Sequence, residues 1–253
     1  MRLADALGVA RDEVVAFVGG GGKTTAMFRL AGEVVESGER VIATTTTHIF
    51  AAQIALAPAH VAAAEATQAS VAAALASHGH VLVIGATDAG SGRAGGVSVE
   101  LFSRLRAWFP GVCIVNEADG SRMRAFKAPA AHEPVIPVET TLVVPVVGAD
   151  VLGKTLDDAS VHRPELVSAL SGAAPGATIT PEIVARVLAH PDGGRKGVPA
   201  GARVSVMINK VENLPDRAPA REIAERLLLE RSVHSVVLTA VRREKPVLEV
   251  WAR

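Results

Sequence analysis

Residues 19–25 read Gly-Gly-Gly-Gly-Lys-Thr-Thr and directly follow the apolar run 14–18. Glycine allows positive φ and close backbone approach, so successive N–H groups of such a stretch can point at one anion. A helix that begins at Thr24 would add the positive end of its dipole. This order of residues predicts a loop that holds phosphates, with Lys23 on the β- and γ-phosphates and the Thr24 hydroxyl on Mg²⁺.

The loop is shorter than the usual phosphate-binding motif. That motif has a glycine six residues before its lysine, where this chain has Phe17. What remains is G-x-x-G-K-T-T, the form seen in muramyl-ligase-type phosphate loops. We expect the backbone of Gly20–Gly22 to surround phosphate oxygens. The predicted nucleotide-binding residues are Gly19, Gly20, Gly21, Gly22, Lys23, Thr24 and Thr25.

Acidic residues follow another apolar run, residues 112–116. Glu117 and Asp119 stand where a carboxylate would organise Mg²⁺-bound water and polarise an attacking nucleophile. We predict that both are catalytic together with Lys23, and that both are metal ligands together with Thr24. Because we expect their side chains to point to opposite sides, only one should reach the metal. Cations that can pair with phosphate or an anionic substrate follow at Arg122, Arg124 and Lys127.

Two further polar segments follow apolar runs. Asn209-Lys210-Val211-Glu212 resembles the Asn-Lys-x-Asp element with which GTPases read guanine, although Glu212 is one methylene longer than the usual Asp. We predict that Asn209, Lys210 and Glu212 contact the base, which favours GTP slightly over ATP and leaves ATP open. Residues 44–48, Thr-Thr-Thr-Thr-His, offer hydroxyls to Mg²⁺-bound water or a substrate.

Short β-type runs alternate with helical patterns along most of the chain. Several runs are apolar on both faces, as in parallel strands covered by helices on each side. We therefore predict an α/β fold, a P-loop NTPase-type three-layer sandwich with a mostly parallel sheet. Residues 1–253 are expected to form a single nucleotide-binding domain, with residues about 150–200 a helical insertion or lid. The expected strands are 14–18, 40–44, 80–85, 112–116, 141–147, 203–209 and 235–239, and the expected helices are 24–37, 65–77, 99–108, 163–170, 181–189 and 218–230.

Composition narrows the class of protein. The 253 residues include 26 basic and 26 acidic side chains, so no overall field draws the chain to nucleic acid or to a membrane. Aromatic residues make up 3% and Tyr is absent, which argues against stacking on bases. No apolar stretch is long enough to span a bilayer. The single cysteine is expected to be a buried small hydrophobe and is typical of a reducing cytoplasm.

Seven segments together resemble one family, the selenium-dependent molybdenum hydroxylase accessory proteins known as YqeC. The most specific is NEADGSRMRAFKAPAAHEPVIP at 116–137. The others are VGGGGKTT at 18–25, TTTTHIF at 44–50, VVGADVLGKTL at 146–156, VHRPEL at 161–166, HPDGGRKGVPAGARV at 190–204 and INKVE at 208–212. The resemblance implies a role in making or inserting the selenium-containing centre of molybdenum hydroxylases, with a client hydroxylase or a selenium cofactor intermediate as partner.

Three hypotheses follow. The first is a Mg²⁺-dependent nucleoside triphosphatase whose hydrolysis drives maturation of a molybdenum enzyme. The second is a kinase or ligase that acts on a small molecule in selenium or molybdenum cofactor synthesis. The third is a nucleotide-responsive adaptor that binds its client and does not turn over. All three require nucleoside triphosphate binding, with GTP or ATP and Mg²⁺, and all three are compatible with a homo-oligomer.

Overall fold

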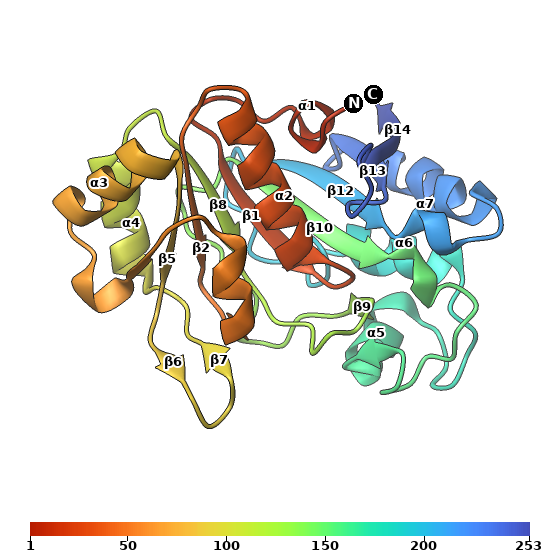
Figure 1. Ribbon diagram of the computed structural model, residues 1–253. Helices are drawn as coiled ribbons and strands as arrows, with labels where there is room; N and C mark the ends of the chain where they lie inside the picture. The colour runs from red at the N-terminus through yellow and green to blue at the C-terminus, as the bar shows by residue number, and fades with distance from the viewer.

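The computed structural model describes residues 1–253, and a nine-stranded sheet runs through it (Figure 1). The strand order is β14-β13-β12-β10-β1-β8-β2-β5-β4, and every neighbouring pair is parallel except β13 and β14. The predicted α/β class with a mostly parallel sheet is therefore confirmed. The bounds are β1 Val14–Gly19, β2 Val41–Thr45, β4 His60–Ala62, β5 His80–Ile84, β8 Cys113–Glu117, β10 Leu142–Gly148, β12 Arg203–Asn209, β13 Ser235–Thr239 and β14 Val247–Ala252.

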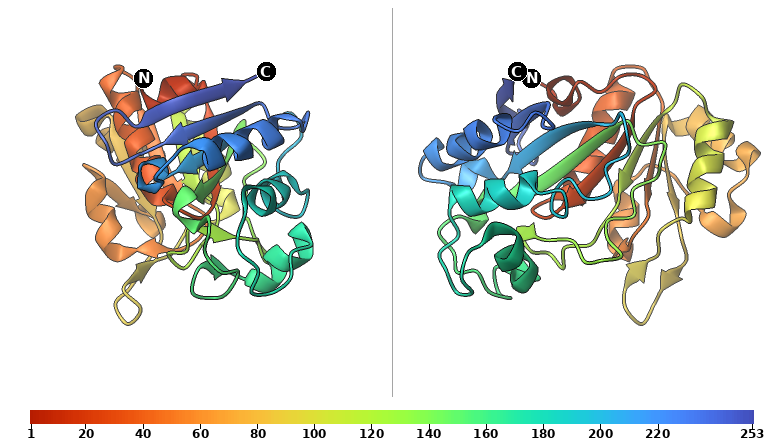
Figure 2. Two further views of the ribbon diagram at one scale, coloured as in Figure 1. Left: turned by 90° about the vertical axis from the view of Figure 1, so that its right-hand side faces the viewer. Right: turned by 180° about the vertical axis from the view of Figure 1, so that it is seen from behind.

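Helices cover both faces of the sheet and make three layers (Figure 2). On one face, α1 (Leu3–Leu7) and α2 (Lys23–Glu36) bury side chains with alternate residues of the central strands, such as Val15 and Phe17 of β1. The opposite face is covered by α3 (Gln68–His78) and α4 (Val99–Trp108) at one end, and by α6 (Pro181–Ala189) and α7 (Ala218–Leu228) at the other.

Local sequence accounts for most element boundaries. In α2, Met27, Leu30, Ala31 and Val34 recur on one face and are buried in the core, as a 3.6-residue period requires. At the start of α6, the Thr180 side chain accepts a hydrogen bond from the Ile183 N–H, and Pro181 takes the first helical position. These two helices therefore follow directly from patterning and capping.

Several parts of the fold were not predicted as elements, among them α1 and the edge strand β4. The edge strand β14 pairs antiparallel with β13 and is half-exposed, so it lacks the apolar run that marks the buried strands. Two small sheets lie beyond the carboxyl ends of the main strands. They are β3 (Ile49–Phe50) with β7 (Arg93–Ala94) and β6 (Thr87–Asp88), and β11 (Val161–His162) with β9 (Phe126–Lys127).

Residues 150–200, for which we expect an insertion or lid, divide between two places. The helix α6 packs into the core layer with α7. By contrast, α5 (Pro164–Ser171) and β11 lie near the carboxyl ends of the strands, beside β9 (Figure 1). Their role as a lid stays a prediction.

Candidate functional site

The four consecutive glycines form a tight bend between β1 and α2. Gly19, Gly21 and Gly22 have positive φ of 93°, 87° and 123°. A Cβ on Gly21 would lie 2.1 Å from the Gly148 nitrogen, so the bend packs directly against the end of β10. Only glycine satisfies both requirements at this position.

The backbone of this bend divides into a held part and a free part. The N–H of Gly19 donates to Asp119, that of Gly20 to the Val146 carbonyl and that of Gly21 to the Arg124 carbonyl. The next four N–H groups have no acceptor within the protein, and they belong to Gly22, Lys23, Thr24 and Thr25. The free donors therefore begin two residues and end three residues later than the predicted Gly20–Gly22, at the N-terminus of α2. They form a concave donor set of the kind that binds anions.

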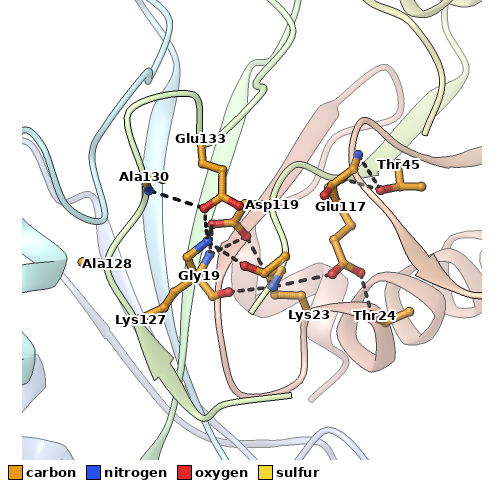
Figure 3. Close-up of polar contacts among 12 residues, drawn as sticks. Gly19, Lys23, Thr24, Thr45, Glu117, Asp119, Lys127, Ala128, Ala130 and Glu133 are labelled. Carbon is orange, nitrogen blue, oxygen red and sulfur yellow. Dashed lines mark hydrogen bonds and ion pairs between the residues drawn. The ribbon is translucent and has the colours of Figure 1, made fainter. Parts of the chain in front are cut away.

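Lys23 lies beneath the bend and is 3% exposed. Its Nζ donates to the Gly19 carbonyl at 2.6 Å and lies 3.5 Å from Glu117 and 3.3 Å from Asp119 (Figure 3). Burial alone would lower the pKa of Lys23, but the two carboxylates outweigh it and the pKa is raised. The ammonium is therefore charged and close to both acidic residues.

Glu117 faces the bend from the end of β8. Its Oε2 accepts a hydrogen bond of 2.6 Å from the Thr24 hydroxyl, so two oxygen ligands lie side by side (Figure 3). Burial raises the pKa of Glu117, and the Lys23 charge and the Thr24 hydrogen bond oppose that rise. No group of three or more His, Cys, Asp or Glu side chains could hold a metal. Mg²⁺ needs no such cage, because it is held by one or two protein oxygens together with waters and phosphates.

Asp119 points to the same side as Glu117, which corrects the expectation that the two diverge. Residues two apart in extended backbone share a face, and both carboxylates reach Lys23. Asp119 is 2% exposed, with its oxygens on the Gly19 N–H, Lys23 and Lys127. These contacts fix the bend, and its role as a metal ligand stays a prediction.

The free N–H groups open into a cavity of about 330 Å³, here called the loop cavity. Its walls carry six basic side chains and one carboxylate, Glu117, so the lining suits a polyanion. Arg122 and Arg124 were predicted to pair with phosphate or an anionic substrate, whereas Arg93 and Arg242 were not predicted, and only tertiary structure brings those two here. The six are Lys23, Arg93, Arg122, Arg124, Lys210 and Arg242.

The three residues predicted to read a base lie in different places. Asn209 is buried, and its Nδ2 donates to the Gly21 carbonyl while its Oδ1 accepts from Thr239 and the Val241 N–H. Lys210 lines the loop cavity and pairs with Asp150 at 2.9 Å. Glu212 lines a separate hollow beside Arg217 and Arg221. Contact of all three with a base stays a prediction.

The run of threonines connects strands. The hydroxyl of Thr44 donates to the Val83 carbonyl, that of Thr45 to the Glu117 carbonyl and that of Thr46 to the Val135 carbonyl. The Thr47 hydroxyl donates to no protein group. Three of the hydroxyls expected to serve a ligand therefore connect the end of β2 to β5, to β8 and to the loop at Val135.

Fold and site together define an α/β protein with a mostly parallel sheet and a glycine-rich bend before α2. A family model described as YqeC protein matches residues 15–165, more than half of the chain. The YqeC protein of Escherichia coli (strain K12) is 31% identical over 227 residues, which cover 86% of this chain and 83% of that protein. The chain belongs to the YqeC family, and the predicted family is confirmed. A solved structure of FlhF complexed with GTP/Mg(2+) aligns over 100% of this chain and 74% of its own, with 14% identity and a TM-score of 0.40.

The helices were also considered as membrane spans. None of the helices combines the length and the apolar character that a membrane span requires.

Proposed function

We propose that the protein binds a nucleoside triphosphate with Mg²⁺ in the loop cavity and hydrolyses it. The observation that carries this proposal is the row of four free N–H groups, Gly22 to Thr25, above the buried Lys23. Backbone donors at a helix N-terminus together with a lysine are the groups that hold the β- and γ-phosphates of a nucleotide.

The negative charge of the site and of the nucleotide explains why nucleotide binding would need a divalent cation. A triphosphate that enters the cavity would bring several negative charges close to Glu117 and Asp119, which share one lysine. Thr24 and Glu117 would hold the ion, since both present oxygen atoms and lie in the cavity wall. Bound Mg²⁺ would neutralise charge on the phosphate oxygens. Glu117 would also orient the attacking water through its other carboxylate oxygen, Oε1, which lies 3.5 Å from the Lys23 Nζ.

Equilibrium binding tests the proposal. GTP, ATP and CTP would each be titrated with and without Mg²⁺ by calorimetry and by thermal shift, because a bound ligand stabilises the fold by mass action. We expect Mg²⁺-dependent binding in the wild-type protein and in Lys154→Ala, whose lysine is exposed and lines neither the loop cavity nor its neighbour. Lys23→Ala should no longer bind the nucleotide. Thr24→Val should bind the nucleotide without any dependence on Mg²⁺. Binding unchanged in Lys23→Ala would refute the phosphate-loop assignment.

The base preference is a finer part of the same proposal. We favour GTP slightly, on the sequence Asn209–Glu212 and on the contact of Asn209 with the bend. The order of the three affinities decides this point, and ATP binding tightest would exclude the guanine assignment while leaving the loop intact.

We place this activity in the maturation of selenium-dependent molybdenum hydroxylases, on the family resemblance alone. The test is complementation: in cells that lack this gene, hydroxylase activity should return with the wild-type protein and not with Lys23→Ala. Return of activity with both would separate the pathway role from nucleotide binding.

A small-molecule kinase or ligase is the second candidate function. A second cavity that shares four residues with the loop cavity favours it, because a transfer reaction requires an acceptor beside the nucleotide. Phosphate release that requires an added acceptor would distinguish it from simple hydrolysis.

A further inference from the structure

The second cavity has a volume of about 610 Å³, within the range of small-molecule sites. It lies beside the loop cavity, and both are lined by His48, Arg93, Gly120 and Arg122. A ligand in either cavity would therefore meet the same wall. None of the sequence motifs for nucleotide binding accounts for this space.

The lining of the second cavity is strongly basic. Three arginines and three histidines face a single carboxylate, Glu133. The charge of that carboxylate is already countered, because its Oε2 accepts from Arg163 and from Lys127, each at 2.6 Å. The histidines form no metal-binding group with acidic residues. An excess of cations without a metal cluster points to an anionic ligand.

Two of the arginines are held in unusual backbone conformations. Arg122 has φ 46° and Arg163 has φ 64°, both in the left-handed region that non-glycine residues rarely adopt. Such residues gather at ligand clamps, where the surrounding structure maintains them. Arg122 makes no hydrogen bond or ion pair within the protein, and Arg93 makes only a stacking contact with Phe50. Both guanidinium groups are therefore available to a ligand.

A chain of ion pairs connects the second cavity to the phosphate-binding bend. Lys23 pairs with Asp119 at 3.3 Å, Asp119 with Lys127 at 3.0 Å, and Lys127 with Glu133 at 2.6 Å. Glu133 then pairs with Arg163, which lines the second cavity. Figure 3 shows the first three of these pairs as a continuous line of side chains. The two cavities are thus parts of one electrostatic network.

We propose that the second cavity binds a small molecule carrying an oxyanion group, and that Arg122 and Arg163 recognise that group beside the nucleotide's terminal phosphate. The position beside the phosphate rests on the proposed function, whereas the anion site itself does not. The ligand class is a phosphorylated, carboxylated or related oxyanion metabolite, and such a molecule would supply the acceptor that the transfer hypothesis requires.

His162 supplies a local probe of this site. Burial, together with the smaller effects of the nearby Arg163, Lys127 and Arg122 charges, lowers its pKa to about 4, against an opposing effect of Glu133. An oxyanion bound between these cations would offset their charge, so the pKa of His162 should rise. Imidazole resonances followed by NMR across pH report this change directly.

The test uses orthophosphate and citrate as probes, with the full chain. We expect wild-type protein to bind two orthophosphates, one in each cavity. Lys23→Ala should lose one of them, and Arg163→Asn should lose the other together with the His162 response. Asparagine tolerates the left-handed backbone at this position. The affinity for the second orthophosphate should fall about 10- to 100-fold in Arg163→Asn, as when a charge-assisted hydrogen bond is removed. Arg231→Asn, at an exposed arginine, is the matched control.

The outcomes separate the two proposals. Binding unaffected by Lys23→Ala would overturn the nucleotide site and leave the second cavity standing. A His162 resonance that neither probe moves, or equal binding in Arg163→Asn and wild type, would overturn the second site. His132→Ala provides a second variant if Arg163→Asn does not fold, because His132 is exposed and lines only the second cavity. Citrate binding without orthophosphate binding would assign the site to carboxylates.

Discussion

The loop cavity and the second cavity share a wall but are constructed differently. The first takes its donors from four consecutive backbone N–H groups and one lysine, all within residues 22–25. The second takes its arginines and histidines from five distant segments, around residues 48, 93, 122, 132 and 163. A contiguous site depends on backbone conformation, whereas a dispersed one depends on ion pairs that hold side chains in place. Ligand binding in the two cavities should therefore be lost in response to different mutations.

The largest effect is expected from Gly21→Ala. Its positive φ and the 2.1 Å approach to Gly148 leave no room for a Cβ, so the bend must rearrange. We expect a loss of about 3 kcal/mol of stability and nucleotide binding below detection. Chemical denaturation and calorimetry measure the two effects.

Gly32→Ala is the control for this substitution. Gly32 lies inside α2, and a Cβ there would meet nothing within 4 Å. Because alanine has a higher helix propensity than glycine, the free energy of unfolding of this variant should rise by about 0.5–1 kcal/mol. The variant should bind nucleotide normally. Nucleotide bound equally by both variants would show that the loop cavity does not depend on backbone geometry.

The second prediction distinguishes the role of Asp119 from that of Glu117. Asp119→Asn removes the charge between two buried lysines and should cost about 3 kcal/mol of stability. It should damage both cavities, because Asp119 connects them. Glu117→Gln should instead weaken Mg²⁺-dependent binding with a smaller loss of stability. Urea unfolding and Mg²⁺ titration distinguish them, with Asp192→Asn on the surface as control. Equal destabilisation by both variants would contradict the division of roles.

The third prediction is a dependence on pH that involves the second cavity. Burial would raise the pKa of Glu133, but the hydrogen bonds from Arg163 and Lys127 lower it to about 2. A carboxylate with a lowered pKa contributes stability that is complete above its ordinary value of 4.5 and lost as pH falls through about 2. The contribution should be on the order of 1 kcal/mol after solvent screening.

Urea unfolding at pH 6 and pH 3 checks this dependence. The difference in stability between wild type and Glu133→Gln should be smaller at pH 3. A difference that stays constant between the two values would mean that Glu133 does not stabilise the pairing with Arg163 through its charge.

The smallest effect is expected from Arg122→Asn. This arginine is exposed, lines both cavities and has no partner within the protein. Stability should change by less than about 0.5 kcal/mol, while nucleotide and orthophosphate each bind several-fold more weakly. Calorimetry on both ligands measures this. Weakening of only one ligand would assign Arg122 to one cavity and sharpen the boundary between them.

Much of the first site could be predicted from residue order alone. The run of glycines, Lys23 and Thr24 between a buried strand and an amphipathic helix indicated the loop, because those signals are local. Glu117 was found because it ends an apolar strand. The free donors nevertheless lie later than predicted, since the held N–H groups of Gly19–Gly21 depend on acceptors in other segments.

The sequence by itself determined the family, the alternation of strands and helices and the glycine-rich bend before α2, because each depends on neighbouring residues. Only the tertiary structure decided that Asp119 fixes the bend, that Lys127 is buried between two carboxylates, and that Arg93 reaches the same wall as Arg122. The physical reason is that charge pairing acts through space. The order of strands in the sheet sets which side chains meet, and no spacing along the chain encodes that order.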